Sequence, residues 1–299
     1  MSSSSVLITG ASGFIGTALV KFLLKKGYIV FALSHQKKPK LQHACLTWIS
    51  HFEQITTPID YVINLAGQNI GEKRWTAQRK QELIQSRVET TEKLYQYLTE
   101  NQFYPKVIIS GSAIGFYGID EQQKWEQICT EQSAPQDIFM STLCQKWEQV
   151  TQQYPKQNTK IIRLGVVLGQ DGGILKQLLF PIQWNLVGKI ASGKQPFVWI
   201  HLDDVLAAIE FLMTQTTEES VFNLVAPEQN TQADFVRLTA KLLNRHPIFT
   251  LPSCISKLAF GEQAQLVMNG QYVQPQALQK AGFQFQYPTL DCALQNLLQ

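Results

Sequence analysis

The fold is decided by the stretch Val6-Leu-Ile-Thr9-Gly10-Ala-Ser-Gly13-Phe-Ile-Gly16 near the start of the chain. Its first four residues form a compact apolar run, typical of a buried strand, and residues 14 to 26 place apolar side chains on one helical face. Between them, Gly10 permits a tight turn, Gly13 lets a pyrophosphate approach bare backbone, and Gly16 lets the helix pack close to the sheet. The start of the helix then presents unpaired amides and a partial positive charge to phosphates. The motif predicts a dinucleotide site made by Thr9, Gly10, Ser12, Gly13, Phe14, Ile15 and Gly16.

The rest of the first half alternates apolar runs with helical patterns. Strands are predicted at 28–33, 45–49, 60–64, 106–110 and 160–164, and longer helices at 76–100 and 138–153. Continuous apolar strands of this kind favour a parallel sheet covered on both faces. The predicted fold class is therefore α/β, with a Rossmann-type doubly wound parallel sheet in residues 1–168 and a smaller C-terminal substrate lobe in 169–299. A helix at 203–213 and a strand at 221–224 are expected to rejoin the sheet, so that residues 200–225 complete it and the two parts are interleaved.

Composition excludes several classes of protein. The 299 residues can bury a large core without disulfides or metal. The chain has 26 Lys and Arg against 23 Asp and Glu, with no dense basic run, which argues against a dedicated nucleic-acid binder. None of its five cysteines form a Cys-x-x-Cys pair, so we expect no metal site and no disulfide framework. No apolar run reaches about 18 residues and no signal peptide is visible, so we expect no membrane span and a cytoplasmic location.

The turn after the second predicted strand bears on the choice of cofactor. NAD sites place an acidic residue here to accept from the ribose hydroxyls. This chain has Leu33-Ser34-His35-Gln36-Lys37-Lys38, without any acid. Hydroxyl and basic groups suit a 2′-phosphate, so the sequence favours NADP over NAD. The alternative is an ordinary solvated loop of charges.

Further motifs carry a resemblance to a known family. The Gly-x-x-Gly-x-x-Gly spacing is joined by Asn64-Leu-Ala-Gly67, Ser110-Gly-Ser-Ala-Ile-Gly-Phe-Tyr-Gly118, Arg163-Leu-Gly-Val-Val-Leu-Gly169 and Trp199-Ile-His-Leu-Asp-Asp204. With these motifs the chain resembles, over nearly its whole length, the epimerase-family branch of atypical extended short-chain dehydrogenase/reductases, often labelled nucleoside-diphosphate-sugar epimerase-like.

The resemblance implies roles for further residues along the cofactor. Ser34 and His35 would meet the adenosine phosphate. The loop after the fourth strand would lie along the cofactor with Leu65, Ala66 and Gly67, and the next helix would present Glu82 and Arg87. Arg87 would offer charge-assisted hydrogen bonds to a phosphate, unless this is only a salt-bridged surface helix. Gly165 and Val166 would lie beside the nicotinamide carboxamide.

The catalytic set implied by the resemblance is incomplete. Members of the superfamily normally use a Ser, a Tyr that acts as acid or base, and a Lys four residues later that lowers the pKa of the Tyr. Ser112 matches the Ser, but the other two positions fall on Met140 and Cys144. Cys144 in an apolar helix is most simply a small buried hydrophobic residue. The nearest remaining phenol, Tyr117, is a candidate acid, with structural packing as the alternative.

These implications leave three classes of function open. The first is an NADP-dependent oxidoreductase or epimerase with a modified catalytic set, acting on an unidentified small molecule and with a homodimer as a possible assembly. A catalytically weak or inactive NADP-binding regulatory protein is the second. The third is a purely structural interaction protein, which would leave the glycine turn unexplained.

One local prediction concerns the helix expected at 203–213. Asp203 or Asp204 is predicted to cap it, because a carboxylate at a helix start accepts otherwise unpaired amide hydrogens. The preceding His201 is expected either to face the substrate lobe or to be a buried, hydrogen-bonded imidazole.

Overall fold

The computed structural model describes residues 4–34, 41–253, 255 and 261–299, and these residues are built around a parallel sheet. The sheet has seven strands in the order β11-β7-β5-β4-β1-β2-β3. Every neighbouring pair is parallel, which confirms the predicted fold class. The strands are β1 (Ser5–Thr9), β2 (Ile29–Leu33), β3 (Leu46–Ile49), β4 (Tyr61–Asn64), β5 (Val107–Ala113), β7 (Thr159–Leu164) and β11 (Val221–Leu224).

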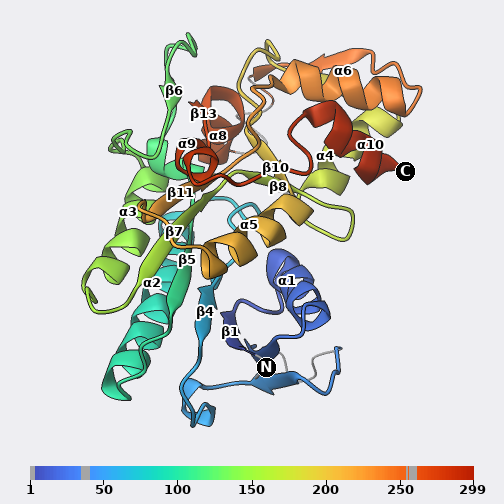
Figure 1. The fold of residues 1–299 in the computed structure, drawn as a ribbon. Coiled ribbons are helices and arrows are strands. Elements are labelled where there is room, and N and C mark those ends of the chain that lie inside the picture. The colour runs from blue at the N-terminus through green and yellow to red at the C-terminus, as the bar shows by residue number, and fades with distance from the viewer. Residues whose placement is uncertain (1–3, 35–40, 254, 256–260) are drawn as a thin grey trace.

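Helices cover both faces of the sheet. Helices α2 (Ala77–Glu100) and α3 (Phe139–Gln152) lie on one face, and α1 (Phe14–Lys25) and α5 (Leu202–Thr214) on the other (Figure 1). Apolar residues of both layers are fully buried against the strands, as the continuous apolar strand runs predict. No described helix is long and apolar enough to cross a membrane.

The far edge of the sheet is formed by a late segment of the chain. Strand β11 pairs with β7 in the register Val221↔Ile161 to Leu224↔Leu164. The strand predicted at 221–224 therefore lies in the main sheet, next to the strand predicted at 160–164. The domain boundary at residue 168 stays a prediction.

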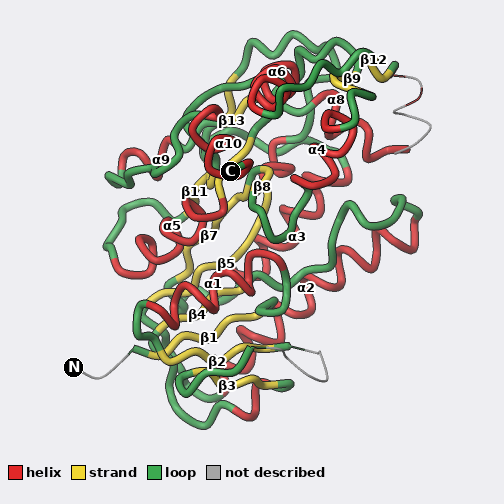
Figure 2. Tube along the Cα trace, turned by 90° about the vertical axis from the view of Figure 1, so that its right-hand side faces the viewer, coloured by secondary structure: helices red, strands yellow, loops and turns green. Residues whose placement is uncertain are grey.

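A second group of elements lies beyond one end of the sheet, as Figures 1 and 2 show from two sides. Because the chain enters it directly after β5 and β7, this is the carboxyl end of the strands. A separate buried apolar cluster joins three of its helices, at residues 175–183, 232–242 and 290–298. The elements are β6 (Ile128–Cys129), β8 (Val166–Leu168), α4 (Leu175–Gln183), β9 (Val187–Ile190), β10 (Trp199–His201), α6 (Gln232–Leu242), β12 (Phe249–Leu251), α8 (Ala264–Asn269), β13 (Tyr272–Val273), α9 (Gln276–Lys280) and α10 (Leu290–Leu298), with single turns of 3₁₀ helix, η2 (Ile114–Tyr117) and η3 (Gly261–Gln263). A further 3₁₀ turn, η1 (Phe52–Gln54), lies apart from this group, between β3 and β4, where Phe52 stacks on Tyr97 of α2.

The predicted cap of α5 is wrong. The N-cap residue is His201, whose Nδ1 accepts a hydrogen bond from the backbone amide of Asp203 at 3.1 Å. Asp204 instead turns into the protein and accepts from the backbone amides of Gln286 (2.7 Å) and Tyr287 (3.0 Å). His201 itself is buried, with its Nε2 3.1 Å from Asn296 Oδ1, which agrees with the second expectation for this residue. Asp204 therefore holds the C-terminal segment against α5.

Candidate functional site

The glycine turn after β1 has the geometry that its sequence predicts. Gly10 has φ +68°, and a Cβ there would stand 2.6 Å from the carbonyl oxygen of Leu65. A Cβ on Gly16 would stand 2.1 Å from the carbonyl oxygen of Gly10, so α1 can approach the turn only because this residue is a glycine. Gly13 is different, because its Cβ position meets only the Gly10 oxygen, at 3.2 Å. A side chain at Gly10 or Gly16 would thus clash severely with the backbone, whereas one at Gly13 would make a single tight contact.

The start of α1 is open. Gly13 is the N-cap residue and no side chain within the described ranges caps the helix. Ser12 and Gly13 are exposed, whereas Ile15 is half-buried. The ring of Phe14 lies against the loop after β8, where Cβ positions on Gly169, Gly172 and Gly173 would all come within 2.8 Å of it. Amides and a partial positive charge at such a helix start favour a phosphate.

A chain of buried hydrogen bonds supports the turn from below. Thr9 Oγ1 donates to Asn64 Oδ1 at 2.6 Å, and Asn64 Nδ2 donates to Thr91 Oγ1 at 2.8 Å. The same Thr91 oxygen accepts from Trp147 Nε1 at 3.0 Å. This chain joins β1, β4, α2 and α3, so the Thr9 hydroxyl is occupied inside the protein. It fixes the end of β1 beside the end of β4. The loop of Leu65, Ala66 and Gly67 begins directly after β4.

Arg87 of α2 reaches that loop. Its Nη2 donates to the carbonyl oxygen of Gln68 at 2.9 Å, and its guanidinium lies 5.3 Å from the Trp147 ring centre. A Cβ on Gly67 would meet Arg87 Cζ at 3.0 Å, so the glycine makes room for the guanidinium. Burial lowers the pKa of Arg87, but an arginine remains charged at any ordinary pH. A permanent positive charge therefore stands beside the loop.

Glu82 joins the same region through Arg79, a residue to which the sequence analysis assigned no role. Arg79 is buried, and its Nη1 lies 3.1 Å from Glu82 Oε2 while its Nη2 donates to the carbonyl oxygen of Asn69 at 2.8 Å. It also donates to the side chain of Gln68. Glu82 therefore contacts the loop after β4 through Arg79, and Arg87 contacts it directly. The i, i+3 spacing of Arg79 and Glu82 was the signal available in the sequence.

The remaining predicted cofactor residues lie at the ends of other strands. Ser34 follows β2, is buried, and donates its backbone amide to the carbonyl oxygen of Ile49 at 3.0 Å. His35 lies outside the described residues. Gly165 and Val166 follow β7, and their amides donate to the carbonyl oxygens of Leu224 (3.1 Å) and Val198 (2.9 Å). These segments, like the glycine turn, stand at the carboxyl edge of the sheet, where open α/β sheets bind ligands.

Ser112 belongs to a buried polar network. Its hydroxyl donates to Glu148 Oε1 at 2.6 Å. The two carboxylate oxygens of Glu148 also accept from Nε (2.9 Å) and Nη2 (2.8 Å) of Arg163, a bidentate ion pair that is about 5% exposed on each side. Sequence reasoning missed this pair, because its members lie on α3 and β7 and no local pattern links them.

Tyr117 extends the same network. Its hydroxyl donates to Asn223 Oδ1 at 2.6 Å and accepts from Arg163 Nη1 at 2.9 Å. The residue is 1% exposed, and burial, which outweighs the nearby Arg163 charge, raises the pKa of Tyr117 to about 12. Asn223 Nδ2 continues to the carbonyl oxygen of Gln274, which links the sheet to the C-terminal lobe. This geometry favours the packing alternative for Tyr117.

The two positions that carry Tyr and Lys in the family that this chain resembles are occupied by buried side chains that behave as apolar groups. Met140 is buried, and a Cβ on Gly115 would meet its Cε at 2.8 Å. Cys144 is 1% exposed, its Sγ lies 3.6 Å from the carbonyl oxygen of Ala113, and burial raises the pKa of its thiol to about 12. A neutral thiol and a thioether offer no proton acid of useful strength at neutral pH. No group of three or more His, Cys, Asp or Glu within the described ranges could hold a metal ion.

Comparison with known proteins agrees with this arrangement. A model of the NAD dependent epimerase/dehydratase family matches residues 6–224, from β1 to the end of β11. The chain belongs to this family. A second model, a domain of unknown function (DUF1731), matches residues 251–297. The family confirms the resemblance stated from the sequence motifs.

Family members similar to this chain include both bacterial and human proteins. An epimerase family protein of Staphylococcus saprophyticus is 33% identical over 299 residues, which cover 98% of each chain. The crystal structure of the human epimerase family protein SDR39U1 with NADPH is 30% identical, covers 98% of each chain and superposes with a TM-score of 0.87. The UDP-glucuronic acid 4-epimerase of Bacillus cereus, in complex with NAD, covers 97% of this chain at 18% identity and a TM-score of 0.73, a likeness of fold alone.

Proposed function

We propose that this family member binds NADP at its first strand–helix turn and acts as an epimerase-family oxidoreductase on an unidentified small molecule, without the usual Tyr and Lys pair. The observation that carries the proposal is Gly13, an exposed N-cap residue at the start of a helix that no described side chain caps. Such a helix start binds a pyrophosphate through backbone amides.

Two observations support NADP over NAD. The segment after β2 begins with Ser34 and carries no acidic residue up to Lys40. The human relative, 30% identical over 98% of each chain, was crystallised with NADPH. In this proposal Arg87, with Glu82 and Arg79 behind it, holds the loop of Leu65, Ala66 and Gly67 along the cofactor.

The bound cofactor would supply or accept a hydride. The chain's own part is to orient it, through Gly165 and Val166 after β7 and the loop after β4. The acid or base of the reaction is not assigned to Tyr117, because both hydrogen-bonding directions of its hydroxyl are already used. A cytoplasmic location and a homodimer remain predictions from the sequence.

A binding experiment tests the cofactor proposal. We expect the full chain to bind NADPH at least tenfold more tightly than NADH in a calorimetric titration. Ser34→Asp, which places a carboxylate where a 2′-phosphate would approach, should weaken NADPH binding at least tenfold and leave NADH binding within about twofold. Ser34→Ala removes the hydroxyl without adding a charge, so it should weaken NADPH binding less than Ser34→Asp does and leave NADH binding within about twofold. Tighter binding of NADH to the unaltered chain would overturn the preference for NADP.

A second candidate function is NADP binding without turnover, as in a regulatory protein. It is favoured by the network around Arg163, which engages the hydroxyls of both Ser112 and Tyr117 in buried hydrogen bonds. Stopped-flow measurement of NADPH oxidation against a panel of carbonyl compounds and sugar nucleotides separates the two. Oxidation with any member of the panel supports the enzyme, and binding without oxidation supports the regulatory protein.

A further inference from the structure

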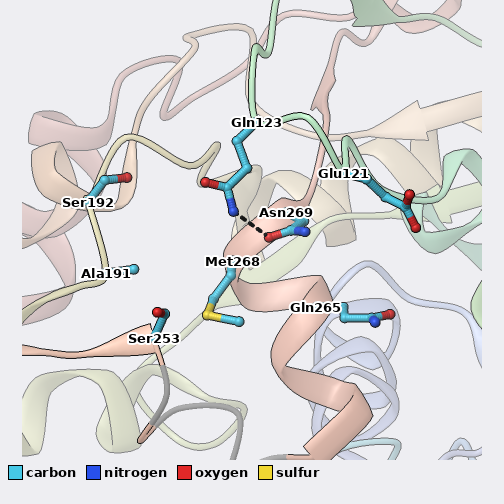
Figure 3. A pocket seen from close by; sticks show the side chains of 8 residues that line it. All are labelled: Glu121, Gln123, Ala191, Ser192, Ser253, Gln265, Met268 and Asn269. Carbon is cyan, nitrogen blue, oxygen red and sulfur yellow. Dashed lines mark hydrogen bonds between the residues drawn. The ribbon is translucent and has the colours of Figure 1, made fainter.

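The C-terminal lobe contains a cavity with a volume of about 290 Å³, close to the lower end of ordinary small-molecule sites. Its walls come from four segments far apart in the sequence: the loop before β6, the turn after β9, Ser253 after β12, and α8. Figure 3 shows their side chains, which are Glu121, Gln123, Ala191, Ser192, Ser253, Gln265, Met268 and Asn269. The cavity is at the same end of the sheet as the glycine turn, because β5 continues through η2 into the first wall.

Hydrogen bonds hold the walls together. Gln123 Nε2 donates to Asn269 Oδ1 at 3.0 Å, a contact that joins the first wall to α8 (Figure 3). The backbone amide of Asp120 donates to the carbonyl oxygen of Asn269 at 2.7 Å. On the other side, the amide of Ala191 donates to the carbonyl oxygen of Leu251 at 2.8 Å. The cavity is therefore bounded by connected structure.

Two wall residues adopt unfavourable backbone conformations. Gln123 has φ +56° and Ala191 has φ +49°, a region that residues with a Cβ avoid. Left-handed non-glycine residues persist only where surrounding contacts enforce them, and they gather at ligand sites. Gln123 and Ala191 each lie in a turn, and these two turns line different walls of the cavity.

The lining is polar but almost uncharged. Carboxamides come from Gln123, Gln265 and Asn269, and hydroxyls from Ser192 and Ser253, with the side chain of Met268 as a buried apolar surface. Carboxamides and hydroxyls both donate and accept hydrogen bonds, so they suit a ligand rich in hydroxyl or amide groups. The thioether of Met268 suits the apolar face of a ring.

The charge of the cavity disfavours a phosphorylated ligand. Among its described lining residues, the one charged side chain is the carboxylate of Glu121, and none is Lys or Arg. Phosphates are bound through cations or well-placed amides, and a neighbouring carboxylate repels them.

We propose that this cavity binds an uncharged, hydroxyl- and amide-bearing part of the substrate and does not take a nucleoside diphosphate. The proposal rests on the proposed function, since it names the substrate class of the same NADP-dependent protein. It separates this chain from relatives of the same fold whose structures hold UDP-sugars.

Saturation-transfer NMR on the full chain tests the proposal with two probes, N-acetylglucosamine and UDP. With NADPH present, we expect N-acetylglucosamine to bind and UDP to bind no more tightly. Asn269→Ala removes the carboxamide contact across the cavity and should weaken the binding of N-acetylglucosamine at least fivefold. Gln265→Leu, at an exposed position of α8, is a second variant that does not disturb the contact between the walls, and it should weaken the same probe.

A charge exchange sharpens the test. Glu121→Lys should raise the affinity for UDP at least fivefold, while Glu126→Lys, in the same loop but outside this cavity, should leave it unchanged. The proposal is overturned if the unaltered chain binds UDP more tightly than N-acetylglucosamine, if N-acetylglucosamine does not bind, or if neither cavity variant weakens N-acetylglucosamine binding. Repeating the titration without NADPH, and measuring NADPH binding separately, distinguishes loss of this site from loss of the cofactor site.

Discussion

The guanidinium of Arg163 forms a bidentate ion pair with the carboxylate of Glu148, and both side chains are about 5% exposed. A buried pair of this kind is costly to break on one side, because the remaining charge loses its partner inside the protein. Since Glu148 also accepts the Ser112 hydroxyl and Arg163 also donates to Tyr117, the pair organises the end of the sheet beneath the lobe.

Glu148→Gln should therefore lower the free energy of unfolding by about 3–5 kcal/mol, the range found when one partner of a buried ion pair is removed. The double variant Glu148→Leu, Arg163→Met removes both charges. Its free energy of unfolding should fall by less than that of Glu148→Gln. Urea denaturation followed by circular dichroism measures both. A single variant as stable as the unaltered chain would contradict the role of the pair.

Tyr117→Phe should reduce stability but leave cofactor binding unchanged. The substitution removes the hydrogen-bond donor to Asn223 Oδ1 and one of the two acceptors of Arg163 Nη1, at a cost of about 1–3 kcal/mol. Tyr95→Phe is the matched control, because that buried hydroxyl pairs with the neutral Thr159 Oγ1 rather than with a charged group, and a smaller loss is expected. If Tyr117→Phe instead abolished turnover at unchanged stability, Tyr117 would be the acid after all.

The two glycines Gly13 and Gly16 should separate ligand binding from folding. Gly16→Ala places a Cβ 2.1 Å from the Gly10 oxygen and should destabilise the fold by about 1–3 kcal/mol. Gly13→Ala brings its Cβ to 3.2 Å from that oxygen, a much smaller clash, so it should destabilise the fold less than Gly16→Ala does and weaken NADPH binding at least tenfold by blocking the phosphate. Thermal melting and NADPH titration of each variant give the two readouts. Equal NADPH affinity in Gly13→Ala would argue against the turn as the phosphate site.

Acid should destabilise the protein through His201. Burial lowers the pKa of His201, although Asp203 and Asp204 act in the opposite direction, and its Nδ1 is an acceptor for the Asp203 amide. The unfolded chain therefore takes up a proton before the folded one, so stability is complete above the unfolded pKa of about 6.5 and is lost as pH falls below it. The melting temperature should drop between pH 7.5 and pH 5.5. His201→Gln should melt lower at neutral pH but vary less with pH, and an equal slope in both would exclude His201 as the titrating group.

Local patterns in the sequence were sufficient for the sheet and the glycine turn. Continuous apolar runs predicted the seven strands to within a few residues, because a strand covered on both faces has no polar side to obscure it. Contacts between distant segments were not accessible. Asp204 was predicted as a cap, since Asp at a helix start usually caps, but it binds backbone amides more than eighty residues away. Glu148 and Arg163 carry no local signal, because their pairing depends on α3 lying over β7.

The placement of β11 constrains the order in which the molecule can be assembled during synthesis. The edge strand beside β7 consists of residues 221–224, so β7 has an unpaired edge until they have left the ribosome. A nascent chain ending near residue 168 would expose that edge, together with the apolar side chains that α5 later covers, to pairing with other chains. Molecular chaperones would therefore be needed most in the interval between the completion of β7 and that of β11.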